Sequence, residues 1–119
     1  MAEHLDFGSK GEEMAAQFLE QKGYRILERN WVYQHLEIDI IAYTGQTLVF
    51  IEVKTRSSSD FGMPEDFVLR LKQQRIARAA EFYRQQIDHQ EEVRFDIIAI
   101  LFSGNASQIN HIEDAFWPQ

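Results

Sequence analysis

The sequence predicts an α/β protein in which helices cover a mixed β-sheet. Helical and strand patterns follow one another in the order helix, three strands, helix and strand, and a short final stretch also fits a strand. Nearly continuous apolar runs at 38–42, 48–51 and 97–101 are typical of strands buried on both faces. A helix between the third and fourth strands implies that these two strands are parallel, so the sheet contains both orientations.

The first third of the chain predicts a helix followed by a strand. Residues 10–22 have apolar side chains at the spacing of an amphipathic helix. Ser9 is the predicted N-cap, Glu12 would complete a capping box, and Gly23 would end the helix. Residues 24–31 then predict the first strand, although apolar and polar side chains alternate imperfectly along it.

Two further strands, at 35–43 and 47–55, are predicted to form a hairpin. Gly45 stands in the first central position between Thr44 and Thr47, which favours a type II′ turn. If Thr44 faces Thr47, the residue numbers of every cross-strand pair have the same sum. This sum fixes the partner of each residue and the face on which its side chain lies.

In this register Asp39 faces Glu52 and Glu37 faces Lys54, all on one face. The side chains expected on the other face are Ile38, Ile40, Ala42, Ile51 and Val53. Because like charges directly opposite each other repel, Asp39 and Glu52 need a counter-charge. Lys54 supplies part of it, and a divalent cation with oxygen ligands would supply the rest. The alternative is a surface ladder of acids with one lysine ion pair, which would contribute little to stability. The apolar runs beside these residues favour the metal site, because they indicate central strands, in which charged side chains are uncommon without a function.

The second half of the chain predicts a loop, a helix and one or two strands. The polar stretch 56–62 reads as a loop, and a second helix is predicted from Pro64 to about residue 87. Val93–Phe102 predicts a strong strand, and 109–112 fits a short last one. The predicted buried stripe of the second helix consists of Leu69, Ile76, Ala80, Tyr83 and Ile87.

Composition limits the cellular and chemical possibilities. A length of 119 residues predicts one domain, spanning 1–119. Without cysteine the chain has neither disulfides nor thiolate zinc sites. The N-terminal residues lack the features of a signal peptide, and no apolar run approaches the roughly 20 residues of a membrane span. We therefore expect a cytoplasmic protein without membrane contact.

The net charge of −7 argues against broad, non-specific binding to nucleic acid. The distribution of charge softens this objection, because residues 70–84 contain five basic side chains and one acidic one. This segment predicts a local basic face, with an ordinary solvated helix face as the alternative. The four histidines are scattered and have no metal-ligand spacing.

An ordered set of short motifs extends through nearly the whole chain: Gly11-Glu12, Gly23–Leu27, Arg29-Asn30, Glu37–Ala42, Val49–Arg56, Arg94–Asp96 and His111–Phe116. Together they resemble the YraN-like family of small bacterial proteins, within the restriction-endonuclease-like (PD-(D/E)xK) nuclease superfamily. The resemblance implies a three-layer α/β fold similar to archaeal-type Holliday-junction resolvases. One departure is Leu36, where the family usually has glycine.

The resemblance also implies roles for particular residues. Asp39 resembles the principal metal ligand, Glu52 the second, and the backbone carbonyl of Val53 would complete the set. Lys54 would orient the attacking water or stabilise charge on the phosphate. Glu12 resembles a helical glutamate that joins the site; its alternative role is the capping box. Oxygen ligands alone favour Mg²⁺ or Mn²⁺ over zinc.

Several other residues have two readings. Glu37 is either the ion-pair partner of Lys54 or an additional ligand. Asp96 is expected to have a role at the strand entry rather than in chemistry. The side chains predicted to contact nucleic acid are Arg56, Lys72, Arg75 and Arg78. Trp31, Tyr33 and Phe61 could stack on unpaired bases, with packing in the core or at its rim as the simpler expectation.

The expected function is hydrolysis of phosphodiester bonds in DNA by a metal-dependent nuclease, with branched or structured DNA as a candidate substrate. The alternative is a nucleic-acid-binding or partner-docking module that retains the nuclease fold without cutting. A homodimer would suit cleavage of both strands of a symmetrical target. A subunit that cleaves only within a larger protein complex is the third possibility.

Overall fold

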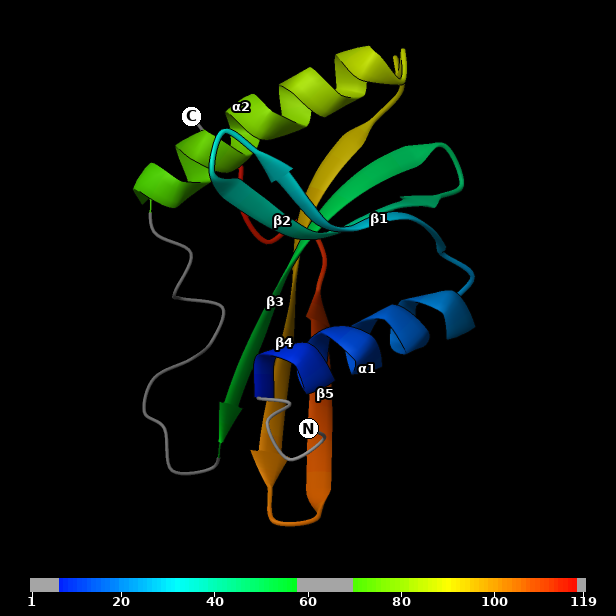
Figure 1. The fold of residues 1–119 in the computed structure, drawn as a ribbon. Helices are drawn as coiled ribbons and strands as arrows, with labels where there is room; N and C mark the ends of the chain where they lie inside the picture. The colour runs from blue at the N-terminus through cyan, green and yellow to red at the C-terminus, as the bar shows by residue number, and fades with distance from the viewer. Residues whose placement is uncertain (1–6, 58–69, 118–119) are drawn as a thin grey trace.

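The computed structural model describes residues 7–57 and 70–117, which form two helices and five strands. These are α1 (Phe7–Gln21), β1 (Arg25–Tyr33), β2 (Leu36–Thr44), β3 (Thr47–Ser57), α2 (Arg70–Gln86), β4 (Val93–Ser103) and β5 (Ala106–Ile112). The strands lie in the sheet in chain order, and β3 and β4 are parallel while the other neighbours are antiparallel. The helices lie on opposite sides of the sheet (Figure 1). The predicted three-layer α/β fold and the order of its elements are confirmed.

Helix α1 approaches the sheet closely through a glycine. Gly11 is buried, and a Cβ atom added to it would overlap the side-chain methyl of Thr55 on β3. Farther along the helix, Ala15 and Leu19 pack in the cluster that includes Ile51. The small residue therefore fixes the height of the first turns of α1 above β3, and with it the position of the neighbouring residues on the helix.

We expect Gly11→Ala to destabilise the protein, although alanine is the better helix former. Helix propensity alone would stabilise the variant by about 1 kcal/mol. Overpacking against Thr55 is expected to cost about 1–3 kcal/mol and to outweigh that gain. Thermal unfolding should show a lower Tm for Gly11→Ala and recovery when Thr55→Ser removes the opposing methyl group. A Tm equal to or above that of the wild type for the single variant would show that α1 does not sit this close.

The end of α1 forms as the sequence predicts, but its beginning does not. Gly23 has a φ of 93°, the amide of Gly23 donates to the carbonyl of Glu20, and the amide of Tyr24 donates to that of Leu19. This is the Schellman arrangement, in which glycine adopts the left-handed conformation after the last turn. Ser9 lies inside α1, two residues after its first residue, so the predicted capping box does not cap this helix.

Helix α2 covers the opposite face of the sheet. Its buried side chains Ile76, Ala79, Ala80 and Tyr83 pack in the cluster that contains Phe50. Ile87 lies beyond the end of the helix and is 37% exposed, so its predicted place in the buried stripe is wrong. The predicted helix start at Pro64, and with it Phe61 and Leu69, lies outside the described residues. Neither described helix has the length and apolar composition needed to cross a membrane.

The β2–β3 hairpin has the predicted register over its first half. Thr44 pairs with Thr47 and Ile40 with Ile51, and Gly45 has the positive φ, 58°, that the predicted turn requires. The antiparallel pairing ends at Ile40, however, and beyond it the prediction fails. The pairs predicted for Asp39 with Glu52 and for Glu37 with Lys54 are not part of the β2–β3 ladder, and Glu37 keeps only its pairing with Val32 of β1.

The strands separate because the tip of the β1–β2 hairpin turns toward α2 (Figure 1). Ile38, expected beside Ile40, packs instead in the cluster under α2. A register shift between Ile26 and Glu28 accompanies this curvature, and it explains the imperfect alternation of the first strand.

Three strand boundaries differ from the predicted ones by two or three residues. β1 reaches Tyr33. β3 continues to Ser57, so Arg56 is a strand residue and not part of a loop. β5 begins at Ala106, three residues earlier than expected, because Gly104 with a φ of 62° allows a tight turn directly after β4.

Candidate functional site

The point where β2 leaves β3 carries a half-buried carboxylate. Oδ2 of Asp39 accepts a hydrogen bond of 2.7 Å from the backbone amide of Val53. The side chain thus bridges the two strands just where their backbone pairing stops. Burial, together with the negative charge of Glu52, raises the pKa of Asp39 to about 7. Two acids therefore lie close together in a place where water solvates them poorly.

Glu52 is the more deeply buried of the two acids, with 3% of its surface exposed. Its Oε1 lies 3.1 Å from Nζ of Lys72 on α2, while its Oε2 is buried and has no hydrogen-bond partner among the described residues. Burial raises the pKa of Glu52 against the opposing charge of Lys72. An orphaned carboxylate oxygen in the interior is costly, which suggests that another group satisfies it in the functional state.

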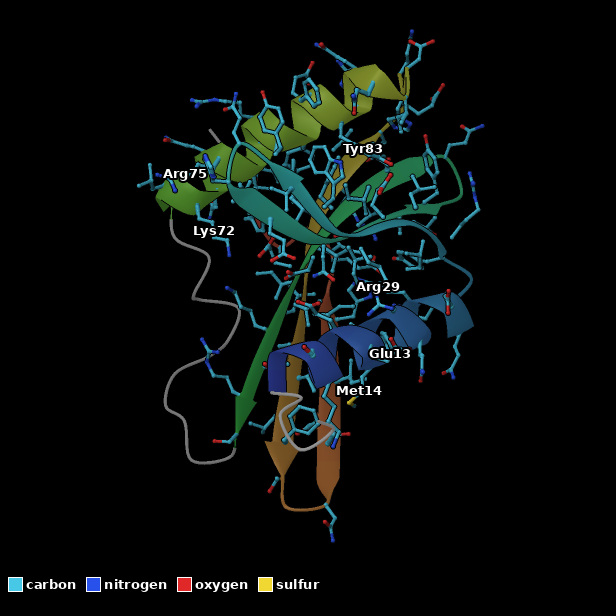
Figure 2. The ribbon with its side chains drawn as sticks, viewed as in Figure 1. Glu13, Met14, Arg29, Lys72, Arg75 and Tyr83 are labelled. Atoms are coloured by element: carbon cyan, nitrogen blue, oxygen red, sulfur yellow. The ribbon has the colours of Figure 1, made fainter. Side chains whose placement is uncertain are left out.

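Two lysines stand beside this acid pair. Lys72 projects from the first turns of α2 toward the sheet (Figure 2). Burial alone would lower the pKa of Lys72, but the carboxylate of Glu52 outweighs it and raises that pKa. Burial and the neighbouring charge of Lys72 lower the pKa of Lys54. The sequence indicates Lys72 only as a phosphate contact; its ion pair with Glu52 requires the folding of α2 onto the sheet.

Glu12 reaches the same region from the other layer. Its Oε1 accepts a hydrogen bond of 2.8 Å from the side chain of Asn30 on β1, and its charge contributes to the raised pKa of Asp39. Glu13, one residue later, pairs instead with Arg29 at 2.9 Å, and the two side chains face each other in Figure 2. Of the two glutamates in this turn, Glu12 is therefore the one near the acid pair.

The acid pair has the chemistry of a site for a hard cation. Its donors are carboxylate oxygens, Asp39 has a second oxygen besides the one bonded to Val53, and Oε2 of Glu52 lacks a partner among the described residues. No group of three or more His, Cys, Asp or Glu side chains in the described ranges is arranged to hold a metal. Mg²⁺, however, is commonly held by one or two carboxylates, with waters and substrate phosphates as the remaining ligands. The residues present fit that mode.

The other predicted residues lie at different distances from the acid pair. Glu37 is exposed, and its charge acts to raise the pKa of Glu52. Arg56 lies on β3 and donates a hydrogen bond to the carbonyl of Thr55 at 2.8 Å. Arg75 and Arg78 are exposed on α2 and line a groove against the β1–β2 hairpin. Trp31 and Tyr33 stack on each other at the rim of α2.

One charged cluster escapes sequence reasoning. Asp96 is fully buried, and its carboxylate accepts hydrogen bonds from Arg94, from His111 and from the backbone amide of Asp114. The cluster ties β4, β5 and the segment after β5 together, which gives Asp96 a structural role at the strand entry. The alternation of an arginine and an aspartate, Arg94 and Asp96, at the start of a buried strand is the available signal, but the histidine partner lies fifteen residues away.

A mixed five-stranded sheet between two helices is consistent with the three-layer fold of the restriction-endonuclease-like class. The model of the uncharacterised protein family UPF0102 matches residues 11–100. A UPF0102 protein of Flavobacterium psychrophilum is 50% identical over 117 residues, which cover 98% of this chain and 98% of the relative. A UPF0102 protein of Phocaeicola vulgatus is 45% identical over 118 residues, which cover 99% of this chain and 98% of the relative. A UPF0102 protein of Rhodococcus opacus is 43% identical over 118 residues, which cover 98% of this chain and 100% of the relative. The chain belongs to the UPF0102 family, and the predicted YraN-like resemblance is confirmed.

Proposed function

We propose that the protein is a nuclease that uses Mg²⁺ or Mn²⁺ to hydrolyse phosphodiester bonds in DNA, with branched or structured DNA as its substrate. The observation that carries this proposal is the buried carboxylate of Glu52. One of its oxygens is paired with Lys72, and the other is left without a partner among the described residues. Beside it lies Asp39, a second acid with a raised pKa. Structural ion pairs rarely leave a buried carboxylate oxygen unsatisfied.

The residues divide the chemistry among them. Asp39, Glu52 and the carbonyl of Val53 would hold the ion, which when bound lowers the pKa of a coordinated water and neutralises charge on the phosphate. Burial and the charge of Lys72 lower the pKa of Lys54. Lys54 is suited to orient the water and to stabilise charge developing on the phosphate. In hydrolysis the water oxygen bonds to phosphorus while one ester P–O bond breaks, and the leaving oxygen takes up a proton.

Glu52→Gln should separate metal binding from the fold. The variant keeps the shape of the side chain and loses the charge, so we expect calorimetry to record heat with Mn²⁺ for the wild type and none for Glu52→Gln. Cleavage of a labelled four-way junction in Mn²⁺ should fall by about a hundredfold or more, because metal-assisted charge stabilisation is worth several kcal/mol. Glu20→Gln, which changes an exposed glutamate of α1, serves as the matched control. Equal heats for the wild type and Glu52→Gln would show that Glu52 does not bind the metal, contrary to the proposal.

A second candidate is a module that binds nucleic acid without cutting it. The observation in its favour is that the described residues contain no group of three side chains arranged around a metal position. Junction binding that persists in EDTA, combined with an absence of cleavage in Mn²⁺, would favour this candidate over the nuclease.

A further inference from the structure

A groove runs between α2 and the tip of the β1–β2 hairpin. Its volume is about 280 Å³, just below the roughly 300–1,000 Å³ typical of sites for small molecules. A second groove of about 560 Å³ shares Tyr33 and Arg78 with the first and continues along α2 toward Gln85. The smaller groove is lined by Tyr33, Gln34, His35, Leu36, Arg75 and Arg78.

The two grooves present uncompensated positive charge. Arg75 and Arg78 are exposed, and within the described part of the chain neither takes part in an ion pair. Glu81, the acid in the larger groove, is itself neutralised by Arg84 through contacts of 2.6 and 3.1 Å. On a chain with a net charge of −7, these two guanidinium groups mark a local preference for an anion.

Aromatic rings form the wall beside this charge. The rings of Tyr33 and Phe82 stack with centroids 4.6 Å apart, and Trp31 lies parallel to Tyr33 at 6.1 Å. Phe82 is 40% exposed. An exposed aromatic surface next to guanidinium groups matches the pattern by which proteins hold single-stranded nucleic acid, with bases on the rings and phosphates on the cations.

Basic side chains on α2 extend from the grooves toward the acid pair. Lys72, Arg75 and Arg78 are spaced three residues apart on α2, which corresponds to steps of about 4.5 Å along the helix axis. Lys72 contacts Glu52, and Figure 2 shows Lys72 and Arg75 emerging from neighbouring turns of the same end of α2. A chain of phosphates that followed these cations would therefore lead from the grooves to the acid pair.

We propose that these grooves bind an unpaired polynucleotide strand and lead it to the acid pair, an inference that deepens the proposed function and rests on it for the role of that pair. The paired bases of a duplex are stacked on one another and offer no free face to Phe82 or Tyr33, whereas unpaired bases do. The substrate class is then a nucleic acid with a single-stranded segment next to the bond that is cut, such as a flap, a gap or an opened junction.

Binding can be tested without cleavage by fluorescence anisotropy in EDTA. The probes are a labelled twelve-nucleotide oligothymidylate, its uridylate counterpart and a blunt DNA duplex of the same length, which separate DNA, RNA and paired strands. Arg75→Ala and Arg78→Ala should each weaken single-strand binding about tenfold and reduce the salt slope by about one. Arg25→Ala removes an exposed arginine that lines a different groove, so its Kd should change less than about twofold.

Phe82→Leu tests the stacking surface without a change of charge. The variant should weaken single-strand binding about fivefold while leaving the salt slope as in the wild type, because stacking on a base contributes to affinity and does not involve counterions. Two results would overturn the groove: a duplex bound as tightly as the single strand, or a loss in Arg25→Ala equal to that in Arg75→Ala.

Glu52→Gln distinguishes the failure of this inference from failure of the proposed function. In EDTA the variant should bind the single strand as the wild type does, because the grooves do not include Glu52. If the wild type binds single strands in the grooves but cuts no substrate in Mn²⁺, the groove proposal stands and the nuclease proposal is wrong. If the wild type cuts the substrate and Arg75→Ala and Arg78→Ala cut it equally well, the nuclease proposal stands and the groove proposal is wrong.

Discussion

Asp39→Asn is expected to unfold at a higher temperature than the wild type when no metal is present. The wild type buries two acids together, Asp39 and Glu52, and one oxygen of the pair has no partner among the described residues. Asparagine keeps the side-chain oxygen that accepts from the amide of Val53, and its amino group offers a donor near Glu52. The substitution removes a like-charge repulsion while preserving the hydrogen bond that links β2 to β3.

The pH dependence has a definite sign. The pKa of Asp39 is about 7 in the folded protein, above its ordinary value of 3.8. The unfolded chain therefore releases this proton at lower pH, and the wild type loses stability as the pH rises from about 4 to 7. The full shift would correspond to roughly 4 kcal/mol, and we expect about half of it because the side chain is only half-buried.

Differential scanning calorimetry in EDTA at pH 8 should show a Tm about 5–10 °C higher for Asp39→Asn. At pH 4 the two proteins should unfold at similar temperatures, since the carboxyl is then neutral in the folded wild type. Addition of Mn²⁺ should raise the Tm of the wild type and leave that of Asp39→Asn unchanged. A variant that is less stable than the wild type at pH 8 would mean that the carboxylate is already compensated within the protein.

Replacing Asp96 is expected to have the opposite and larger effect. Its carboxylate is fully buried and is held by Arg94 at 2.9 Å and by His111 at 2.8 Å, with Nε2 of His111 donating to it. Asp96→Ala would leave these donors and the amide of Asp114 without their acceptor in the interior. Breaking a buried pair in this way typically costs about 3–5 kcal/mol. Chemical denaturation should show a loss of this size.

The same cluster predicts a loss of stability in acid. Burial alone would raise the pKa of Asp96, but the hydrogen bonds from His111 and Arg94 outweigh it and lower the pKa below 3.8. A depressed pKa contributes stability that is present above about pH 4 and is lost as the pH falls further. The stability difference between the wild type and Asp96→Ala, measured by chemical denaturation, should therefore be smaller at pH 3 than at pH 6. Glu20→Gln, which changes an exposed acid, should unfold like the wild type at both pH values.

The aspartate at position 96 also marks a limit of sequence reasoning. The strand around it is predictable, because the apolar run from Ile97 onward depends only on neighbouring residues. Its partner His111 is not, since the four histidines have no regular spacing and the contact arises only when β5 pairs with β4. A partner contributed by another strand leaves no local signature in the sequence.

In the candidate site, too, the features set by neighbouring residues are predictable from the sequence, and those set by distant elements are not. Gly45 and the alternation of the flanking strands predict the hairpin register, and Asp39 and Glu52 are the residues directly after its last observed pair, Ile40 with Ile51. The end of the pairing at Ile40 has no such local signal, because it depends on the β1–β2 hairpin turning toward α2. For the same reason the predicted position of Glu37 opposite Lys54 is wrong.

By itself, the sequence determined the order of the elements, the sheet that they form and the proximity of the two acids, since turns, helix ends and side-chain alternation act over a few residues. Only the tertiary structure decided what surrounds those acids. Lys72 meets Glu52 from a helix on one face of the sheet, and Glu12 approaches Asp39 from the helix on the other. These contacts depend on how closely each helix packs on the sheet, and close packing is a property of side-chain volumes that are distant in sequence.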